Sequence, residues 1–115
     1  MKEYLMLIRE DLENYGNLTL QEMQDDIAKH VSWVEELIRN GNFKGGDPLD
    51  STGKHIKGND KIITDGPYIE SKEVISGFYF LLANSLEEAT EISKGCPSLS
   101  TGGTLEIREI MKMND

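Results

Sequence analysis

Two short apolar runs constrain the fold of this chain more than any other feature. Residues 4–8 read YLMLI, and residues 78–82 read FYFLL within the longer run VISGFYFLLA of residues 74–83. Runs that are apolar at consecutive positions are typical of strands that are covered on both faces. Both runs are too short to span a membrane, which takes about 20 residues in a helix. We therefore predict two interior strands of one sheet.

A long helix is predicted between these two runs. Thr19 and Glu22 have the spacing of a capping box, and Asn40 followed by Gly41 supplies a stop. The apolar residues between these ends recur at steps of three and four, which places them along one side of a helix. They predict one buried stripe, which consists of Leu20, Met23, Ile27, Val31, Val34, Leu37 and Ile38.

The remaining segments complete an α+β order. Strand-like pieces at 52–57 and 60–64 flank the sequence GND, which predicts a tight hairpin. A shorter helix follows the second capping box, at Ser85, and the last strand spans about residues 104–111. This order indicates a ferredoxin-like split βαβ fold, with an antiparallel sheet covered by two helices on one face.

The length and the two-sided apolar strands bear on assembly. A chain of 115 residues fits one domain, so we predict a single domain over residues 1–115. Two helices cover only one face of the sheet, and the apolar side chains on the other face need a partner. A second copy packed about a two-fold axis is the simplest partner, and we predict a homodimer.

Charge and cysteine content exclude several classes of function. The chain has 12 Lys and Arg against 21 Asp and Glu, a net charge of -9, and this field repels phosphate backbones. We therefore predict no nucleic-acid partner. Cys96 is the only cysteine, which excludes an intrachain disulfide and zinc sites built from several thiolates. We expect a cytoplasmic protein with no membrane partner.

His30 is the first candidate for chemistry. It lies on the shoulder of the predicted apolar stripe, about 50° from its centre at roughly 100° per residue. Histidine suits general acid–base work because its ordinary pKa, about 6.5, allows both forms near neutral pH. The alternative is a partly buried histidine with a structural role only.

Acidic residues supply candidate partners for this histidine. Asp65 precedes Gly66 and Pro67, where its carboxylate either stabilises the turn or orients an imidazole. Glu70, Lys72 and Glu73 form either an ordinary surface cluster or a carboxylate pair with a cation for an anionic substrate. The two histidines show no metal-ligand spacing, so no metal site is predicted.

The stretch TDGPYIESKEVISGFYFL resembles the D-G-P-F signature of the YCII-related family, in its DGPF subgroup. The apolar first strand, the long helix with His30 and the last strand also look like that family. The matching residues of the signature are Asp65, Gly66, Pro67, Glu70, Lys72, Glu73, Gly77, Phe78 and Tyr79, with Tyr68 in place of the usual Phe.

The resemblance implies a dimeric α/β barrel with one pocket per subunit and a helix histidine paired with an acidic residue. His30 takes the place of that histidine, and either Asp65 or Asp47, in the sequence GGDPLD, is the acid. A few relatives eliminate hydrogen chloride from chlorinated aromatic rings, and others occur beside sigma-factor genes.

Two functions follow as hypotheses. The first is a lyase or isomerase without a cofactor, in which His30 moves a proton and Asp65 or Asp47 orients it, while four residues hold a small molecule. The second is a non-catalytic metabolite-binding or regulatory module, such as one associated with a sigma factor, which would show ligand-dependent stabilisation without turnover. The substrate-binding residues of the first hypothesis are Asp47, Glu70, Lys72 and Tyr79.

Overall fold

The structure is a computed structural model of the chain, and it describes residues 1–11, 13, 16–66 and 73–113. Of the helices in this part of the chain, none combines the length and the hydropathy needed to cross a membrane. The elements are β1 (Lys2–Asp11), α2 (Leu20–Arg39), β2 (Phe43–Pro48), β3 (Gly53–Lys57), β4 (Ile62–Gly66), β5 (Glu73–Ala83), α3 (Leu86–Ser93), the 3-10 helix η1 (Pro97–Thr101) and β6 (Thr104–Glu109).

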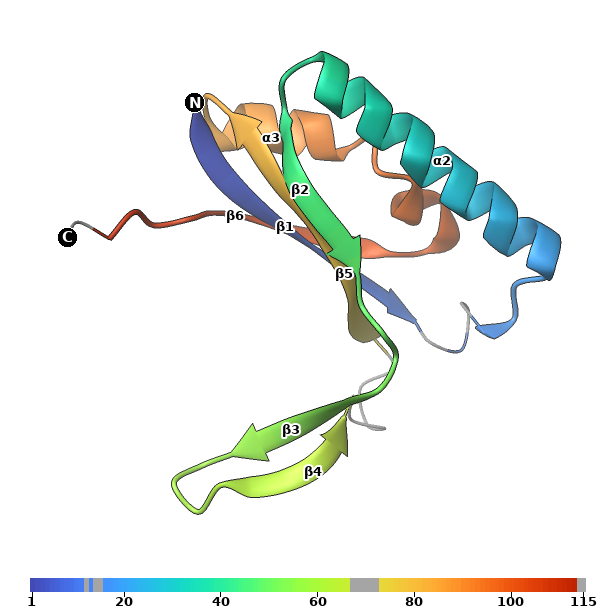
Figure 1. The fold of residues 1–115 in the computed structure, drawn as a ribbon, viewed down its shortest axis with the longest axis vertical. Coiled ribbons are helices and arrows are strands. Elements are labelled where there is room, and N and C mark those ends of the chain that lie inside the picture. The colour runs from blue at the N-terminus through green and yellow to red at the C-terminus, as the bar shows by residue number, and fades with distance from the viewer. Residues whose placement is uncertain (12, 14–15, 67–72, 114–115) are drawn as a thin grey trace.

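Four of the strands form an antiparallel sheet in the order β2-β5-β1-β6 (Figure 1). The two central strands are the two apolar runs of the sequence. Without the inserted β3–β4 hairpin, this is the strand order of a ferredoxin-like split βαβ fold. The predicted fold class, α+β with an antiparallel sheet and two helices, is confirmed.

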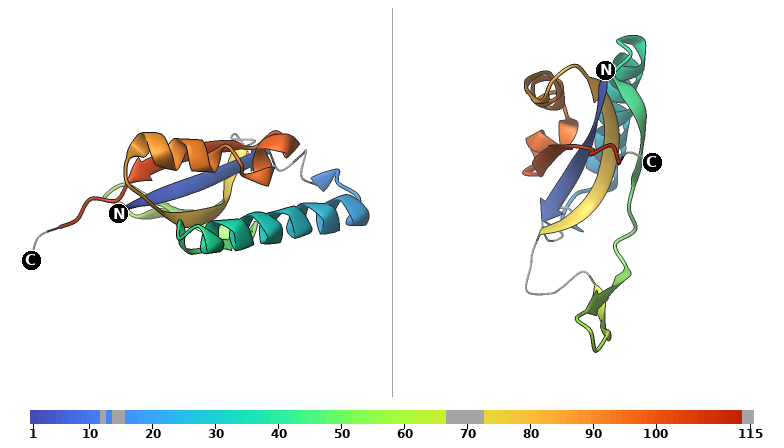
Figure 2. Two further views of the ribbon diagram at one scale, coloured as in Figure 1. Left: turned by 90° about the horizontal axis from the view of Figure 1, so that it is seen from above. Right: turned by 90° about the vertical axis from the view of Figure 1, so that its left-hand side faces the viewer.

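The core lies between the sheet and its two helices (Figure 2). Along β1 burial alternates, so that every second side chain is buried beneath the helices and the others are half-buried on the opposite face. Both helices contribute to the same core, which places them on one face of the sheet. The buried apolar residues are Tyr4, Met6, Ile8, Trp33, Leu37, Leu81, Ala83, Ala89 and Cys96.

The ends of α2 follow the sequence prediction. The Thr19 hydroxyl accepts a hydrogen bond from the Glu22 amide at 3.1 Å, and the Glu22 carboxylate accepts one from the Thr19 amide at 3.1 Å. This is the reciprocal capping box, and it satisfies amide groups that the first turn leaves without a partner. At the other end Gly41 has a positive φ of 75°, which a residue without a side chain adopts readily.

The predicted buried stripe of α2 is correct only in part, since Leu37 is buried as predicted but other members of the stripe are exposed. Ile27 and Val31 are 59% and 52% exposed, and Trp33 is buried instead. The inward positions are Asp26, His30, Trp33 and Leu37, so the buried face is rotated from the predicted one by less than one residue. The indole explains the difference, because it packs edge-on against Tyr79 with ring centroids 5.6 Å apart, at an angle of 76°.

An edge strand was missed in the Gly-rich segment after α2. β2 pairs with β5, where Gly46 lies opposite Tyr79 and Pro48 opposite Gly77. Glycine and proline in FKGGDP conceal the strand in the sequence, but an edge strand tolerates a proline whose nitrogen faces away from the sheet.

The predicted hairpin is present as β3 and β4, with small shifts of its ends. It extends away from the four-stranded sheet (Figure 1). Ile56 and Ile63 lie directly opposite each other in it and are 65% and 63% exposed.

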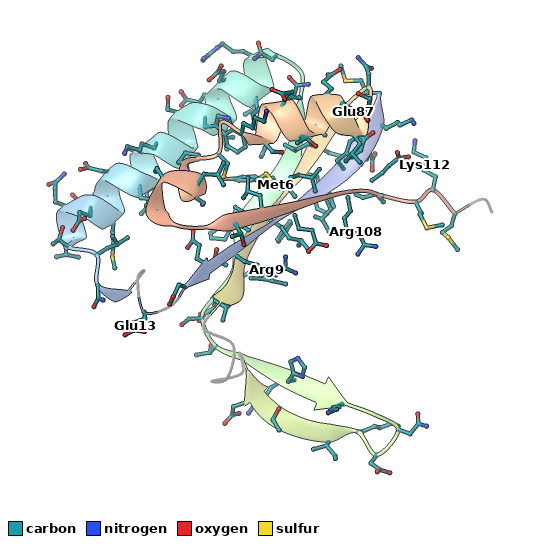
Figure 3. All side chains as sticks on the ribbon, turned by 180° about the vertical axis from the view of Figure 1, so that it is seen from behind. Met6, Arg9, Glu13, Glu87, Arg108 and Lys112 are labelled. Atoms are coloured by element: carbon teal, nitrogen blue, oxygen red, sulfur yellow. The ribbon has the colours of Figure 1, made fainter. Side chains whose placement is uncertain are left out.

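The sheet face opposite the helices is apolar at its centre and charged at its edges. Phe78 and Phe80 make an edge-on contact there, with centroids 5.5 Å apart. At the edges Arg9 binds Glu106 at 2.8 Å; Arg9 and Arg108 lie away from the core residue Met6 (Figure 3). The predicted homodimer, which would cover this face, stays a prediction. The half-buried apolar residues of this outer face are Leu5, Leu7, Phe78, Phe80 and Leu82.

Removing a central core side chain should destabilise the fold. We expect Leu81→Ala to lower the free energy of unfolding by about 2–5 kcal/mol, because Leu81 is fully buried and the deletion leaves a cavity. Urea denaturation followed by circular dichroism measures this change. The control Ile62→Ala, at an exposed hairpin residue, should change stability by less than about 0.5 kcal/mol. Equal effects of the two substitutions would contradict the assigned core.

Candidate functional site

His30 lies between the long helix and the sheet with both ring nitrogens in contact with hydroxyl groups. Its Nδ1 atom is 3.1 Å from the Tyr79 hydroxyl, and its Nε2 atom is 3.1 Å from the Ser98 hydroxyl. These partners come from β5 and η1, so the imidazole connects three elements. Its side chain is 20% exposed, which leaves part of the ring open to a ligand.

Asp26 lies one helical turn before His30 on the same side of α2. Its Oδ2 atom is 3.8 Å from His30 Nε2, and the side chain is only 13% exposed. Its other oxygen, Oδ1, is buried without a hydrogen-bond partner among the described residues. A carboxylate at this distance favours a proton on Nε2, which makes Nδ1 the acceptor for the Tyr79 hydroxyl.

Tyr79 is held in place by the rings and the backbone around it. Its ring makes edge-on contacts with Trp33 and with Phe43, at centroid distances of 5.6 and 5.9 Å. A side chain at Gly46 would collide with the Tyr79 ring and approach the Phe78 carbonyl oxygen to 2.5 Å. Glycine at position 46 is therefore required for the close approach of β2 to Tyr79.

Burial, with smaller contributions from the charges of Cys96 and Asp26, raises the pKa of Tyr79 to about 12. The phenol therefore stays protonated at neutral pH. It is suited to donate a hydrogen bond, either to His30 or to an oxygen of a ligand, and it is not suited to act as a base.

Ser98 is positioned by the short 3-10 helix that follows α3. Its side chain is fully buried, and its carbonyl oxygen accepts a hydrogen bond from the Gly103 amide at 2.9 Å. Burial raises the pKa of the neighbouring Cys96 thiol, and hydrogen bonds from Ser98 reduce this shift. Cys96 therefore remains a thiol within the core.

A cavity of about 480 Å³ opens beside these side chains. Its volume suits a molecule of one or two rings. One wall is apolar and comes from α2, with Ile27, Val31 and Val34; the sheet supplies the opposite wall. The groups that converge on it from three elements are Asp26, His30, Tyr79 and Ser98.

The structure brings together some of the predicted site residues and separates others. His30 and Tyr79 are in direct contact, and Asp47 lines the cavity from β2 without a hydrogen bond to His30. Asp65 lies in the hairpin, 88% exposed and paired with Lys54, and within this chain it does not reach His30. Glu73 begins β5, and Glu70 and Lys72 lie outside the described residues.

Several polar residues at the cavity were missed by the sequence analysis, among them Asp26, Ser98 and Glu10. Asp26 could have been found, because a carboxylate four residues before a histidine lies on the same side of a helix. Ser98 and Glu10 carried no such signal, since only tertiary contacts bring them to the cavity. In the described part of the chain, no three His, Cys, Asp or Glu side chains are grouped so that they could hold a metal ion.

Comparison with known proteins supports a family and a fold. The model of the YCII-related domain family matches residues 3–114. A similar solved structure is 5-chloro-2-hydroxyhydroquinone dehydrochlorinase from Burkholderia phenoliruptrix, in complex with 2,5-dihydroxybenzoquinone. The two chains share 18% identity over 90% of each, with a TM-score of 0.51, a likeness of fold alone. No curated protein matches the chain in sequence.

The raised pKa of Tyr79 predicts a loss of stability in alkali. Because the unfolded tyrosine ionises near pH 10 and the folded one near 12, its contribution is complete below about pH 10 and is lost as pH rises toward 12. Urea denaturation between these two pH values should show a smaller loss in Tyr79→Phe than in the original protein. Parallel pH curves for the two proteins would contradict the buried position of this phenol.

Proposed function

The chain belongs to the YCII-related domain family, and from this membership and the site geometry we propose that it is a cofactor-independent lyase or isomerase acting on a small, ring-shaped molecule. His30 is the group that moves the proton. The acidic residue of the pair is Asp26, in place of the Asp65 and Asp47 that the sequence suggested.

The observation that carries this proposal is the position of His30 at the cavity wall. A purely structural histidine is usually enclosed, whereas this ring lines a space of about 480 Å³. Its Nε2 side faces Ser98 and Asp26, and its Nδ1 side faces a phenol that stays protonated. Such an arrangement fixes the tautomer and leaves Nδ1 as the basic nitrogen.

The proton transfer can be written for these groups. When a substrate enters, the Tyr79 hydroxyl turns from His30 to donate to a substrate oxygen. Nδ1 then takes a proton from the carbon next to the carbonyl carbon of the substrate. The C–H electron pair forms the C=C bond of an enolate, and the Tyr79 hydroxyl stabilises the enolate oxygen. The imidazolium is stabilised by Asp26 on its other side.

Two outcomes of this enolate correspond to the two reaction types. In an isomerase the proton returns to a different carbon. In a lyase the enolate electrons expel a leaving group, which departs with its bonding pair, as chloride does in a dehydrochlorination. The name of the structurally similar dehydrochlorinase supports a reaction of the second kind.

A second copy of the chain is part of the proposal. The outer face of the sheet presents five half-buried apolar residues between charged edges, where Lys44 pairs with Glu3 at 2.6 Å and Arg9 with Glu106 at 2.8 Å. An apolar centre within a polar rim is typical of a protein–protein interface. We expect two sheets to pack face to face, with the cavities on the outer, helical sides.

Proton transfer is tested by deuterium uptake. We expect the protein to catalyse exchange of C–H protons next to the carbonyl group in a panel of cyclic ketones, with and without an amino group, in D₂O, followed by proton NMR. Halogenated members of the panel also report chloride release. His30→Asn should lower the rate by about 10²–10⁴-fold, the usual contribution of a general base.

The matched control is His55→Asn, since His55 is the other histidine of the chain and lies in the hairpin. The exchange rate of this variant should stay within about twofold of that of the original protein, whereas loss of a general base lowers the rate by about 10²–10⁴-fold. A rate that is equal in His30→Asn and the original protein would refute the proposal. Ligand-dependent stabilisation without any exchange would favour a binding or regulatory module instead.

The homodimer is tested by a charge placed at the centre of the outer face. We expect Phe80→Asp to give a monomer in sedimentation velocity at micromolar concentration, because a buried carboxylate without a partner opposes association. Ile56→Asp, in the exposed hairpin, serves as the control and should leave the dimer intact. An original protein that sediments as a monomer would end this part of the proposal.

A further inference from the structure

Glu10 is a buried carboxylate for which the proposed proton transfer has no role. It lies near the end of β1 on the helix-facing side of the sheet and is only 9% exposed. It lines the cavity, and no described residue forms a hydrogen bond or an ion pair with it. Its neighbour Arg9 points to the outer face and binds Glu106 there. A carboxylate in this position is stabilised only if a positive or hydrogen-bonding group reaches it.

The described lining of the cavity is acidic. Its described lining residues include five carboxylates and no lysine or arginine. Burial raises the pKa of Cys96, and the charges of Glu10 and Asp26 add to this, so both carboxylates act on the same part of the core. The lining carboxylates are Glu10, Asp26, Glu35, Asp47 and Asp50.

These carboxylates differ in the number of hydrogen bonds that they accept. Asp50 accepts hydrogen bonds from the Thr52 amide and hydroxyl at 3.0 and 3.1 Å, which hold its pKa below the ordinary value. Asp26 is close to His30 but has one buried oxygen without a partner. Glu10 has no hydrogen-bond or ion-pair partner among the described residues, so its carboxylate can bind a positively charged group of a ligand.

We infer that the ligand of this cavity is an organic cation, a cyclic ketone that carries a protonated amine, whose nitrogen binds Glu10 while its ring packs on Ile27, Val31 and Val34. The inference rests on the proposed function, because it names the substrate class for the same cavity. An organic cation fits better than a metal ion, since the described residues offer no group of three metal ligands. An anionic ligand would meet uncompensated carboxylates and is disfavoured.

The inference runs against the initial expectation of an anionic substrate held by Lys72. That expectation came from the sequence TDGPYIESKE alone, and Lys72 lies outside the described residues. The described wall of the cavity carries the opposite charge.

Three probes of nearly equal shape test the charge of the ligand. We would titrate 2-phenylethylamine, 2-phenylethanol and phenylacetate into the protein at neutral pH. The dissociation constants are measured from NMR shifts of the His30 ring and the Gly46 amide, both at the cavity. We expect the amine to bind at least about tenfold more tightly than the alcohol, equivalent to about 1.4 kcal/mol, and phenylacetate to bind most weakly.

Substitution of Glu10 identifies the group responsible. Glu10→Gln keeps the shape of the side chain and removes its charge. The dissociation constants of the amine and the alcohol should then lie within about twofold of each other, so that the tenfold preference for the amine is lost. Glu36→Gln, an exposed residue of α2 outside the cavity, should leave the preference unchanged. An unchanged preference in Glu10→Gln would overturn the role of Glu10.

Comparison of the probes in the original protein decides the ligand class without any variant. Equal or tighter binding of phenylacetate, or no shift with any of the three, would overturn the inference. If the His30-dependent deuterium exchange persists in that case, the proposed function stands and only the substrate class fails. If the amine binds through Glu10 but no exchange occurs, the ligand class stands and the catalytic function fails.

Discussion

The edge-on contact between Trp33 and Tyr79 is the interaction on which the rest of the site depends. The indole needs the space above the centre of the sheet, and this requirement sets the rotation of α2 about its axis. With the helix in that rotation, Asp26 and His30 face the sheet, and the aliphatic residues Ile27 and Val31 are left exposed. The fold therefore gives up some apolar burial on α2 and places two ionisable side chains inside.

Those ionisable side chains are tolerated because the surrounding elements supply partners. Tyr79 and Ser98 reach the two nitrogens of His30 from β5 and from η1, which lie far apart in the sequence. The displaced aliphatic residues Ile27 and Val31 then become the wall of the cavity and no longer belong to the core. One packing choice thus produces both the polar group that acts and the apolar surface against which a ligand can lie.

The fold could be predicted from the sequence, but the site could be predicted only in part. The apolar runs at 4–8 and 74–83 identified the central strands, and Thr19 and Ser85 located the helix starts, because these signals are local. His30 was placed correctly near the inner face. Its partner Ser98 was not found, since Ser98 approaches it only through a tertiary contact. The buried face of α2 was wrong because periodicity counts apolar residues and gives no extra weight to one large indole.

The hairpin of β3 and β4 is inserted between β2 and β5, which are neighbouring strands of the sheet, so the pairing of these strands holds the two ends of the inserted segment together. Pro48 at the end of β2 lies opposite Gly77 in β5, so the insertion leaves and returns at neighbouring positions of one ladder. The entropic cost of closing the inserted loop depends only weakly on its length, because this cost grows with the logarithm of the number of residues. Relatives could therefore lengthen, shorten or replace this arm during evolution without altering the cavity, which makes it a natural attachment point for new specificities.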